Sequence, residues 1–446
     1  MAPQVTRREF LNTAAATTAT LTASRLPRAA AAERPNVLFI LADDLGYGDL
    51  SCYGRPDYKT PVLDSLAAQG IKFTSAYAAA PVCTPTRCAF ITGRYPQRLE
   101  VGLYEPLRTE DPDRQKGLPP DQPTVASLLK ASKYDTALVG KWHLGWKPEF
   151  GPNRHGFDEF FGILAGVGDY FTHANDRGEP DLWENLAPVE RLGYMTDLLS
   201  DRAVEYIQRK RSRPFYLSLH YTAPHSPWEG PEDEAIGHRE HGPGPMVSGG
   251  SLPIYGSMMT RMDAGIGRVL AALKRAKIDR QTLVIFTSDN GGERYSYNWP
   301  FSFQKLFLFE GGIRVPAIVR WPGVIPAGRV TEQAAITMDW SATLLGVSGA
   351  SADASAPFDG EDLMPICRGT GPVHDRTFYW RTQTRAAARV GKWKYLNDEG
   401  KESLFDLAVD PGEKNDLRAA QQETFDRVRA RYRTWNASML PRLPKS

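Results

Sequence analysis

From about residue 35 onward, the hydrophobic pattern of the chain alternates between two kinds of segment. Short, continuously apolar runs predict buried strands over residues 36–42, 136–140, 215–221, 283–288 and 317–320. Between them, apolar residues recur at helical spacing and predict helices over residues 61–69, 124–132, 196–209 and 255–276. This alternation is typical of an α/β fold, so we expect a large, mostly parallel mixed sheet flanked by helices.

The pattern changes near residue 373, where long helical stretches give way to short β-prone runs. These runs lie at 377–381, 386–390 and 393–396, and a helical stretch follows them at 422–436. We therefore expect a catalytic α/β domain over residues 33–372. A smaller C-terminal subdomain over residues 373–446 should contain an antiparallel sheet and a helix.

The first 32 residues differ in composition from the rest of the chain. They contain the pair Arg7-Arg8, then Phe10-Leu11 and a weakly apolar run rich in alanine and threonine. This resembles a twin-arginine signal peptide, and the run is too short to span a bilayer. The prediction is export by the twin-arginine translocase to the periplasm or outside the cell, with no membrane anchor in the mature form. The alternative is a disordered basic tail.

Net charge and cysteine content argue against three kinds of protein: nucleic-acid-binding, disulfide-rich and zinc-binding proteins. The formal net charge of +2 falls to −1 without residues 1–32, and acidic and basic side chains are interspersed along the remainder. This balance gives no electrostatic reason to expect nucleic-acid binding. Four cysteines in 446 residues do not make a disulfide scaffold, and their spacing fits no zinc site.

Two of the predicted strands end on acidic residues. The first runs into Asp43 and Asp44, and the fourth runs into Asp289 and Asn290. Ligands of open α/β sheets bind beyond the carboxyl ends of the strands, so these groups are expected to converge there. Asp43 and Asp44 can share an ion only if the strand breaks at them. Crowded carboxylates with an amide suit Ca²⁺ or Mg²⁺, whereas each pair alone also fits a turn or a helix cap.

Three further polar residues follow predicted strands. Lys141 and His143 are two residues apart, and in an extended chain both face the same side. An ammonium group beside an imidazole suits an anionic substrate and a proton transfer. His225 lies between two prolines just after a strand, whereas His220 within that strand is expected to be a packed core residue.

The stretch Cys83-Thr84-Pro85-Thr86-Arg87-Cys88 places a thiol near this predicted site. If Cys83 begins a helix, Arg87 lies one turn later on the same face, and Cys88 is rotated away, which disfavours a disulfide between the two cysteines. An oxyanion at that helix N-terminus would meet both backbone N–H groups and the guanidinium group. Because sulfur is a soft ligand, an oxygen nucleophile would suit a hard cation better than a thiolate.

Cys83 to Arg87 resembles the Cys-x-Pro-x-Arg signature of the sulfatase family, which belongs to the alkaline-phosphatase superfamily. Segments along most of the chain resemble other motifs of the family in the same order: 36–49, 93–96, 140–145, 287–292, 310–316 and 404–411. The resemblance implies an alkaline-phosphatase-like fold. It also implies an arylsulfatase-like enzyme that hydrolyses sulfuric esters.

In that family the cysteine is oxidised to Cα-formylglycine, whose hydrated form is a geminal diol. The resemblance implies that a formylglycine-generating enzyme modifies Cys83. It further implies a divalent ion, usually calcium with magnesium as the alternative, bound by Asp43, Asp44, modified Cys83, Asp289 and Asn290. One diol hydroxyl would attack sulfur, and the other would allow sulfate to be expelled.

The resemblance also assigns roles to the remaining candidates. Arg87 and Lys141 would hold sulfate oxygens, and His225, with Lys305 nearby, would protonate the departing alcohol. His143 would accept the proton of the second hydroxyl. The family usually has a Gly-rich polar segment around this lysine, whereas residues 303–309 are apolar here; they are alternatively expected to shape the pocket for the alcohol.

We therefore predict hydrolysis of carbohydrate or aryl sulfate monoesters. The alternatives are a phosphomonoester or phosphonate hydrolase of the same superfamily and a catalytically inactive protein that binds sulfated glycans. Substrate specificity is expected in the loops 166–183 and 230–253. In the second loop, His238 and His241 are expected to face solvent, with the rim of a pocket as the alternative. Five aromatic residues either stack on the substrate or, as the simpler expectation, pack structurally: Tyr170, Phe171, Trp183, Trp228 and Trp299.

Overall fold

A computed structural model describes residues 34–110, 112–233 and 249–444, and residues Arg34–Ser446 form one compact unit. The predicted signal peptide over residues 1–32 and the two loop histidines, His238 and His241, lie outside the described residues. Within the described residues, none of the helices is both long and apolar enough to cross a membrane.

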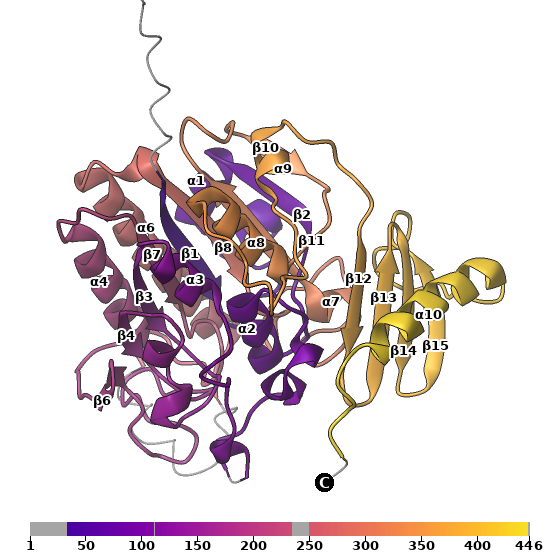
Figure 1. Cartoon of the computed structure of the whole chain (residues 1–446), viewed down its shortest axis with the longest axis horizontal. Coiled ribbons are helices and arrows are strands. Elements are labelled where there is room, and N and C mark those ends of the chain that lie inside the picture. The colour runs from indigo at the N-terminus through magenta and orange to yellow at the C-terminus, as the bar shows by residue number, and fades with distance from the viewer. Residues whose placement is uncertain (1–33, 111, 234–248, 445–446) are drawn as a thin grey trace, which may run out of the picture. The chain divides into compact units, whose positions relative to one another are not determined.

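Eleven strands of the described chain form one mixed sheet (Figure 1). Their bounds are β1 Asn36–Ala42, β2 Ile71–Tyr77, β3 Asp135–Gly140, β4 Glu159–Gly162, β5 Trp183–Glu184, β6 Ala187–Pro188, β7 Phe215–His220, β8 Thr282–Ser288, β9 Arg314–Arg320, β10 Arg329–Thr331 and β11 Ala335–Ile336. The order is β10-β2-β9-β8-β1-β7-β3-β4-β5-β6, and β11 also pairs with β2. The central strands β8, β1, β7, β3 and β4 are parallel, so their carboxyl ends meet at one edge.

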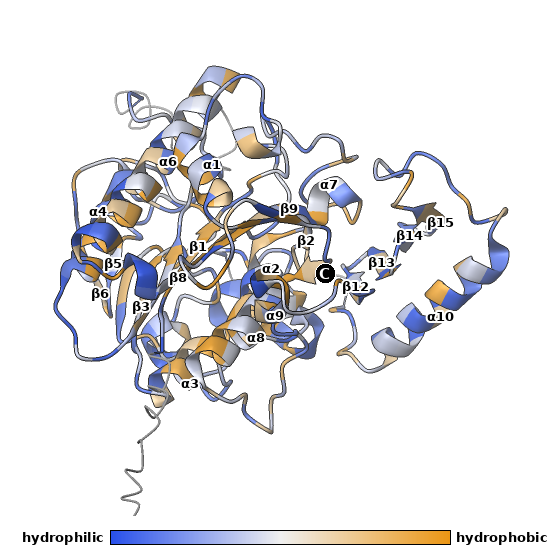
Figure 2. Ribbon diagram, turned by 90° about the horizontal axis from the view of Figure 1, so that it is seen from above, coloured by the Kyte–Doolittle hydropathy of each residue, from blue (hydrophilic) through white to orange (hydrophobic). Residues whose placement is uncertain are grey.

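Helices cover both faces of this sheet (Figure 1). Their bounds are α1 Pro61–Ala68, α2 Cys83–Thr92, α3 Val125–Ala131, α4 Met195–Gln208, α6 Leu252–Arg275, α7 Glu310–Ile313, α8 Thr337–Ser348 and α9 Met364–Arg368. Successive side chains of β1 point to opposite faces. Val37 and Phe39 pack in a cluster with α2, α3 and α8, whereas Leu38 and Ile40 pack with α1, α4 and α6. The central strands are therefore apolar on both faces, as the ribbon coloured by hydropathy shows (Figure 2).

The C-terminal residues form a second, four-stranded antiparallel sheet and one long helix. Their bounds are β12 Thr377–Arg381, β13 Arg385–Val390, β14 Trp393–Asp398, β15 Lys401–Asp406 and α10 Gln422–Ala437. A separate apolar cluster joins this sheet and α10 to side chains of the main sheet, including Tyr77 and Ile336. Trp380 lies in this cluster, and its indole Nε1 donates to the Ala78 carbonyl over 2.8 Å.

A buried group of charges also links the two sheets. Lys394 of β14 has no exposed side-chain surface, and its Nζ lies 2.9 Å from Glu310 Oε1 and 2.7 Å from Glu413 Oε1. Burial raises the pKa of Glu413 to about 7, against the lowering effect of Lys394. In Glu310, Lys394 and Arg314 outweigh the effect of burial and lower the pKa to about 2. Because Glu310 is the first residue of α7, this network ties the C-terminal sheet to α7 of the main domain.

The predicted fold class is confirmed, with differences in detail. The strand predicted at 36–42 has those bounds, and the strand predicted at 317–320 begins three residues earlier and is antiparallel to β8. Several strands were not predicted, among them β4, β5, β6, β10 and β11, which have two to four residues each. The longer β2 and β15 were also not predicted, because lysine, serine or threonine within the strand interrupts the apolar run. The predicted loop over residues 230–253 ends earlier, because Ser251 caps the start of α6.

Candidate active site

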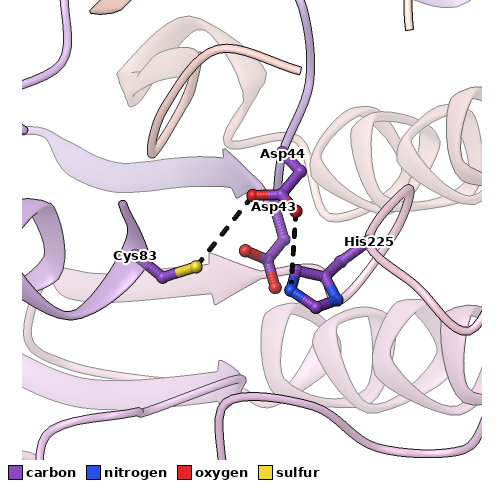
Figure 3. A group of neighbouring side chains, drawn as sticks. All are labelled: Asp43, Asp44, Cys83 and His225. Carbon is purple, nitrogen blue, oxygen red and sulfur yellow. Dashed lines mark hydrogen bonds and ion pairs between the residues drawn. The ribbon is translucent and has the colours of Figure 1, made fainter. Parts of the chain in front are cut away.

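The site begins where β1 ends. Asp44 has a φ of 60°, in the left-handed region, so the strand stops at Ala42 and the chain turns at the two aspartates. This turn is the break in the strand that Asp43 and Asp44 need if they are to bind the same ion. As a result, both carboxylates point toward the start of α2, which carries Cys83 (Figure 3).

Asp43 is buried between two cations. Its Oδ2 accepts a hydrogen bond from Lys141 Nζ over 2.6 Å, and its Oδ1 lies 3.3 Å from the guanidinium group of Arg87. Burial alone would raise the pKa of Asp43, but Lys141 and Arg87 outweigh it and hold the pKa well below its usual range. Asp43 is therefore a carboxylate in the folded protein.

Asp44 connects the other members of the site. Its Oδ2 accepts from Lys305 Nζ over 2.6 Å and lies 3.4 Å from His225 Nε2. Its Oδ1 accepts from Asn290 Nδ2 over 2.7 Å and lies 4.0 Å from Cys83 Sγ. One carboxylate thus contacts residues from four separate segments of the chain. Figure 3 shows two of these contacts, those with Cys83 and His225.

Asp289 follows β8 and completes the acidic group. Its Oδ2 accepts two hydrogen bonds from Arg87, over 3.1 and 3.0 Å, and its Oδ1 accepts one from the Asp44 backbone N–H over 3.1 Å. Burial, together with the negative charge of Asp43, raises the pKa of Asp289 to about 8 despite the guanidinium. Because the three carboxylates lie close together and repel one another, they favour the binding of a proton or of another cation between them.

Cys83 is the first residue of α2 and is only 1% exposed. Burial raises the pKa of its thiol. Arg87 lies one turn later and faces the site, whereas Cys88 packs in the apolar cluster on the other side of the helix. The four cysteines are free thiols, which agrees with the expectation that Cys83 and Cys88 do not pair.

His143 reaches the site from the segment after β3. The expectation of an extended chain from Lys141 to His143 is wrong, because β3 ends at Gly140 and His143 has a φ of 59°. Its Nε2 lies 2.9 Å from the Leu107 carbonyl, which can only accept, so Nε2 carries the proton. Nδ1 is buried and has no hydrogen-bond partner. Burial and the nearby Lys141 hold the pKa of His143 well below its usual value, so the ring is neutral with a free Nδ1 lone pair.

His225 and Lys305 lie within hydrogen-bond distance of each other on another side of the site. His225 Nδ1 lies 2.6 Å from the Ser226 carbonyl, so Nδ1 carries a proton, and Nε2 lies 3.2 Å from Lys305 Nζ. Burial and Lys305 lower the pKa of His225 to about 4. Burial favours neutral Lys305, but Asp44 outweighs it and raises the pKa of Lys305 well above its usual value. The ammonium group of Lys305 therefore donates toward the imidazole.

A cavity of about 350 Å³ opens onto these groups. Four of the predicted residues line it: Cys83, His143, His225 and Lys305. Its other walls come mainly from the segment 106–110, from Gly166, Val167 and Asp176, and from Glu293 and Leu306. None of the five candidate aromatic residues is among the described residues that line it. Tyr170, Phe171 and Trp228 are buried in the core, as the packing interpretation expects.

The acidic group fits a divalent cation. Asp43 Oδ1 and Asn290 Oδ1 are buried oxygen atoms without a hydrogen-bond partner, and oxygen ligands are those that Ca²⁺ and Mg²⁺ prefer. Ligand atoms of Asp43, Asp44, Cys83 and His225 lie within 4.8 Å of one another. Asp289 lies outside this group of four, since its Oδ2 faces Arg87.

All ten residues that the sequence predicted for the site lie at this edge of the sheet or line its cavity. The sequence reasoning did not find the residues that orient them. Leu107 accepts from His143, and Thr84 Oγ1 contacts the His143 carbonyl over 3.3 Å. Glu293 lies 3.7 Å from Lys305. Its position just after the Asp-Asn-Gly-Gly motif is a signal that could have identified it.

This mostly parallel sheet, with carboxylates and cations at the carboxyl ends of its strands, is an alkaline-phosphatase-like hydrolase fold. The chain belongs to the sulfatase family, and it is a sulfuric ester hydrolase. Residues 35–350 match the family model described as Sulfatase. Residues 297–434 match the model of the C-terminal region of N-sulphoglucosamine sulphohydrolase.

Individual relatives cover most of the chain. N-acetylgalactosamine-6-sulfatase of Canis lupus familiaris is 37% identical, over 84% of this chain and 74% of its own. Arylsulfatase A of Bos taurus is 33% identical, over 89% of this chain and 86% of its own. The crystal structure titled Ps i-CgsB in complex with k-i-k-neocarrahexaose superposes with a TM-score of 0.82 at 31% identity, covering 90% of this chain and 93% of that one.

Proposed function

We propose that this sulfatase hydrolyses sulfate monoesters of sugars, with a formylglycine formed from Cys83 and a bound divalent cation. The observation that carries the proposal is the position of Cys83 at the first turn of α2, with its Sγ 4.0 Å from Asp44 and at the floor of the cavity. A formylglycine would place oxygen, a ligand suited to a hard cation, where the thiol now lies.

Asp43, Asp44, Asp289, Asn290 and the modified Cys83 would hold the cation, and Ca²⁺ suits the many oxygen ligands better than Mg²⁺. A cation bound there makes a coordinated hydroxyl more acidic and withdraws charge from the sulfate. The three aspartates are opposed by Arg87, Lys141 and Lys305. When all three aspartates are ionised these charges balance, so a divalent cation would leave the site positive for an anionic ester.

The side chains of the site divide the remaining work. Arg87 and Lys141 are both paired with Asp43 and would stabilise the oxygens of the sulfate. The Nδ1 atom of His143 has no hydrogen-bond partner and would accept the proton of the second hydroxyl of the modified Cys83. His225 and Lys305 form the proton-donating side: the ammonium group of Lys305 donates toward His225 Nε2, and through this imidazole the pair would pass a proton to the leaving alcohol.

Burial of Cys83 bears on the partner that modifies it. At 1% exposure the thiol lies beneath the cavity walls, so another enzyme cannot enclose the Cys83 segment in the folded protein. A formylglycine-generating enzyme would therefore act before folding is complete. This order is consistent with export of an already folded chain by the twin-arginine pathway.

The sugar substrate is inferred from relatives and from the cavity walls. One relative is named for N-acetylgalactosamine 6-sulfate, and one similar structure holds a neocarrahexaose. Arg108, Glu110, Asp176 and Glu293 line the cavity with hydrogen-bonding groups that suit hydroxyls. We therefore favour a carbohydrate sulfate over an aryl or sterol sulfate.

A comparison of two esters tests the reaction class. The purified protein should turn over para-nitrophenyl sulfate with a kcat/KM at least about tenfold above that for para-nitrophenyl phosphate, because Lys141 and Arg87 match a singly charged sulfate. The control is the same pair of assays after inhibition by inorganic sulfate. A preference for the phosphate ester would instead identify a phosphomonoesterase of the same superfamily.

Replacing His225 by asparagine should slow poor leaving groups most. A general acid contributes about 10²- to 10⁴-fold, so we expect a loss of about 10²-fold or more for phenyl sulfate. The loss should be smaller for para-nitrophenyl sulfate, whose leaving group needs little protonation. Steady-state kcat values across a series of aryl sulfates measure this difference.

The matched control for that variant is His173→Asn. His173 is also buried, but its Nε2 bonds to the Gly193 carbonyl and it does not line the cavity. Its replacement should leave the dependence on the leaving group unchanged. Equal losses of the His225 variant on all aryl sulfates would remove the role of general acid from His225.

A further inference from the structure

The segment after Trp299 presents two large apolar side chains to solvent. Phe303 is 50% exposed and Leu306 is 49% exposed. Both have a left-handed backbone, with φ of 63° and 76°, a conformation that costs a bulky residue about 1 kcal/mol or more. Neither burial nor local backbone preference accounts for these side chains. We call this pair the apolar shelf.

The apolar shelf is held rigidly against the active site. The Leu306 backbone N–H donates to the Pro81 carbonyl over 2.9 Å, and that of Lys305 donates to the Gly292 carbonyl over 3.0 Å. A Cβ atom at Gly311 would lie 2.2 Å from the Phe303 carbonyl oxygen, so glycine there permits the close packing of the segment. The position of the shelf relative to Cys83 is therefore fixed by backbone contacts.

Aromatic rings support the shelf from within. The ring of Phe303 stacks on that of Phe309, with centroids 4.1 Å apart and planes inclined by 28°. Phe307 lies beside them, 4.9 Å from Phe303, and the guanidinium group of Arg385 lies 4.7 Å from its ring. Phe303 is therefore held by two rings of its own segment, and half of its surface still faces solvent.

One residue of the shelf, Leu306, lines the active-site cavity beside Lys305, and Phe303 lies three residues earlier on the same segment. Other walls of the cavity carry charged groups, those of Arg108, Glu110 and Asp176. A purely hydrocarbon alcohol would cover these groups without giving them hydrogen-bond partners, which is costly. A sugar ring has hydroxyls at its edge and an apolar C–H face, so it satisfies both kinds of surface.

We propose that the apolar shelf binds a sugar ring next to the one that carries the sulfate, so that the enzyme prefers sulfated oligosaccharides to sulfated monosaccharides. The proposal rests on the proposed function. Leu306 would contact the sulfated ring at the mouth of the cavity. Phe303 would stack on its neighbour and thereby set the preference for chain length.

The experiment compares substrates of different length. The probes are chondroitin-6-sulfate and kappa-carrageenan fragments of one, two and four sugar units, with para-nitrophenyl sulfate as a single-ring reference. For at least one series, the wild-type kcat/KM should rise about tenfold from one to four units. In Phe303→Ala that rise should shrink by about fivefold or more, which is the scale of one lost stacking contact.

Two variants serve as controls. Phe303→Tyr keeps the ring and should preserve the length preference, whereas Leu192→Ala removes a side chain that is 96% exposed elsewhere and should change nothing. Thermal unfolding of each variant shows that it is folded.

The outcomes separate this proposal from the proposed function. If no fragment series shows a length preference, or if Phe303→Ala lowers kcat/KM equally for all substrates, the apolar shelf is not a sugar subsite. If the wild-type protein also fails to hydrolyse para-nitrophenyl sulfate and every sulfated sugar, the proposed function itself is wrong.

Discussion

Replacing Cys83 by alanine should lower the kcat for para-nitrophenyl sulfate by about 10³-fold or more, because the side chain that supplies the nucleophile is removed. The fold should remain, since alanine keeps the Cβ atom at the start of α2 and the neighbouring charges pair with one another. Steady-state kinetics measure the loss, and circular dichroism with thermal unfolding verifies the fold.

Cys88→Ala is the matched control. Cys88 lies on the same helix and is fully buried, but in the apolar cluster away from the cavity. Its replacement should cost about 1 kcal/mol of stability and leave kcat unchanged. Two results contradict the role of Cys83: retained activity in its alanine variant, or an unmodified thiol at Cys83 in the mass spectrum of a fully active preparation.

Replacing Lys394 by methionine should destabilise the protein by about 3–5 kcal/mol, because two buried carboxylates lose the cation between them. Glu310 keeps Arg314 at 3.1 Å, so Glu413 bears most of the loss. The midpoint of urea unfolding measures the change. Purification at low temperature keeps enough folded protein for the assay.

The loss of stability in Lys394→Met should also depend on pH. Burial already raises the pKa of Glu413 to about 7, and removing the ammonium group of Lys394 raises it further. The folded variant then binds a proton that the unfolded chain, with a pKa near the usual 4.5, releases. Stability is therefore lost as pH rises, and the difference from wild type should be smaller at pH 5 than at pH 8.

Lys392→Met is the control for this variant. Lys392 lies two residues before Lys394, and it pairs with Asp406 over 2.6 Å, but its side chain is 52% exposed. Exposed ion pairs contribute about 1 kcal/mol or less, so this variant should unfold close to the wild type. Equal midpoints for Lys394→Met and the wild type would show that the buried network does not hold the C-terminal sheet to α7.

The spacing of apolar residues made the fold class predictable, but it does not show the direction of each strand or which strands pair. The strand over residues 36–42 could be read from its apolar run, whereas nothing in the run at 317–320 shows that β9 is antiparallel to β8. β2 was missed because Lys72, Thr74 and Ser75 interrupt its apolar residues. Sheet order depends on contacts between residues far apart in the chain, which a local pattern does not contain.

The candidate site was predictable where chemistry is concentrated in short motifs. Asp43, Asp44, Asp289 and Asn290 follow strands, and parallel strands bring their carboxyl ends together. Leu306 belongs to the segment 303–309 that was expected to shape the pocket, whereas cavity walls such as Arg108 and Glu110 could not be placed, because they lie in an irregular segment whose path follows from tertiary packing. The predicted conformation of His143 was wrong for the same reason: its backbone turns where an extended chain was expected.

The structure separates the residues of the reaction from those of the cavity mouth. Most of the former lie at the ends of strands and at the start of α2, and many of the latter lie on loops such as 106–110; Lys305 is an exception, because it lies within the loop 303–309. Natural selection can thus change a loop such as 106–110 without moving a reactive side chain. Divergence among descendants of this gene should accordingly collect in these loops, and new substrates can be acquired while the ancestral chemistry is inherited intact.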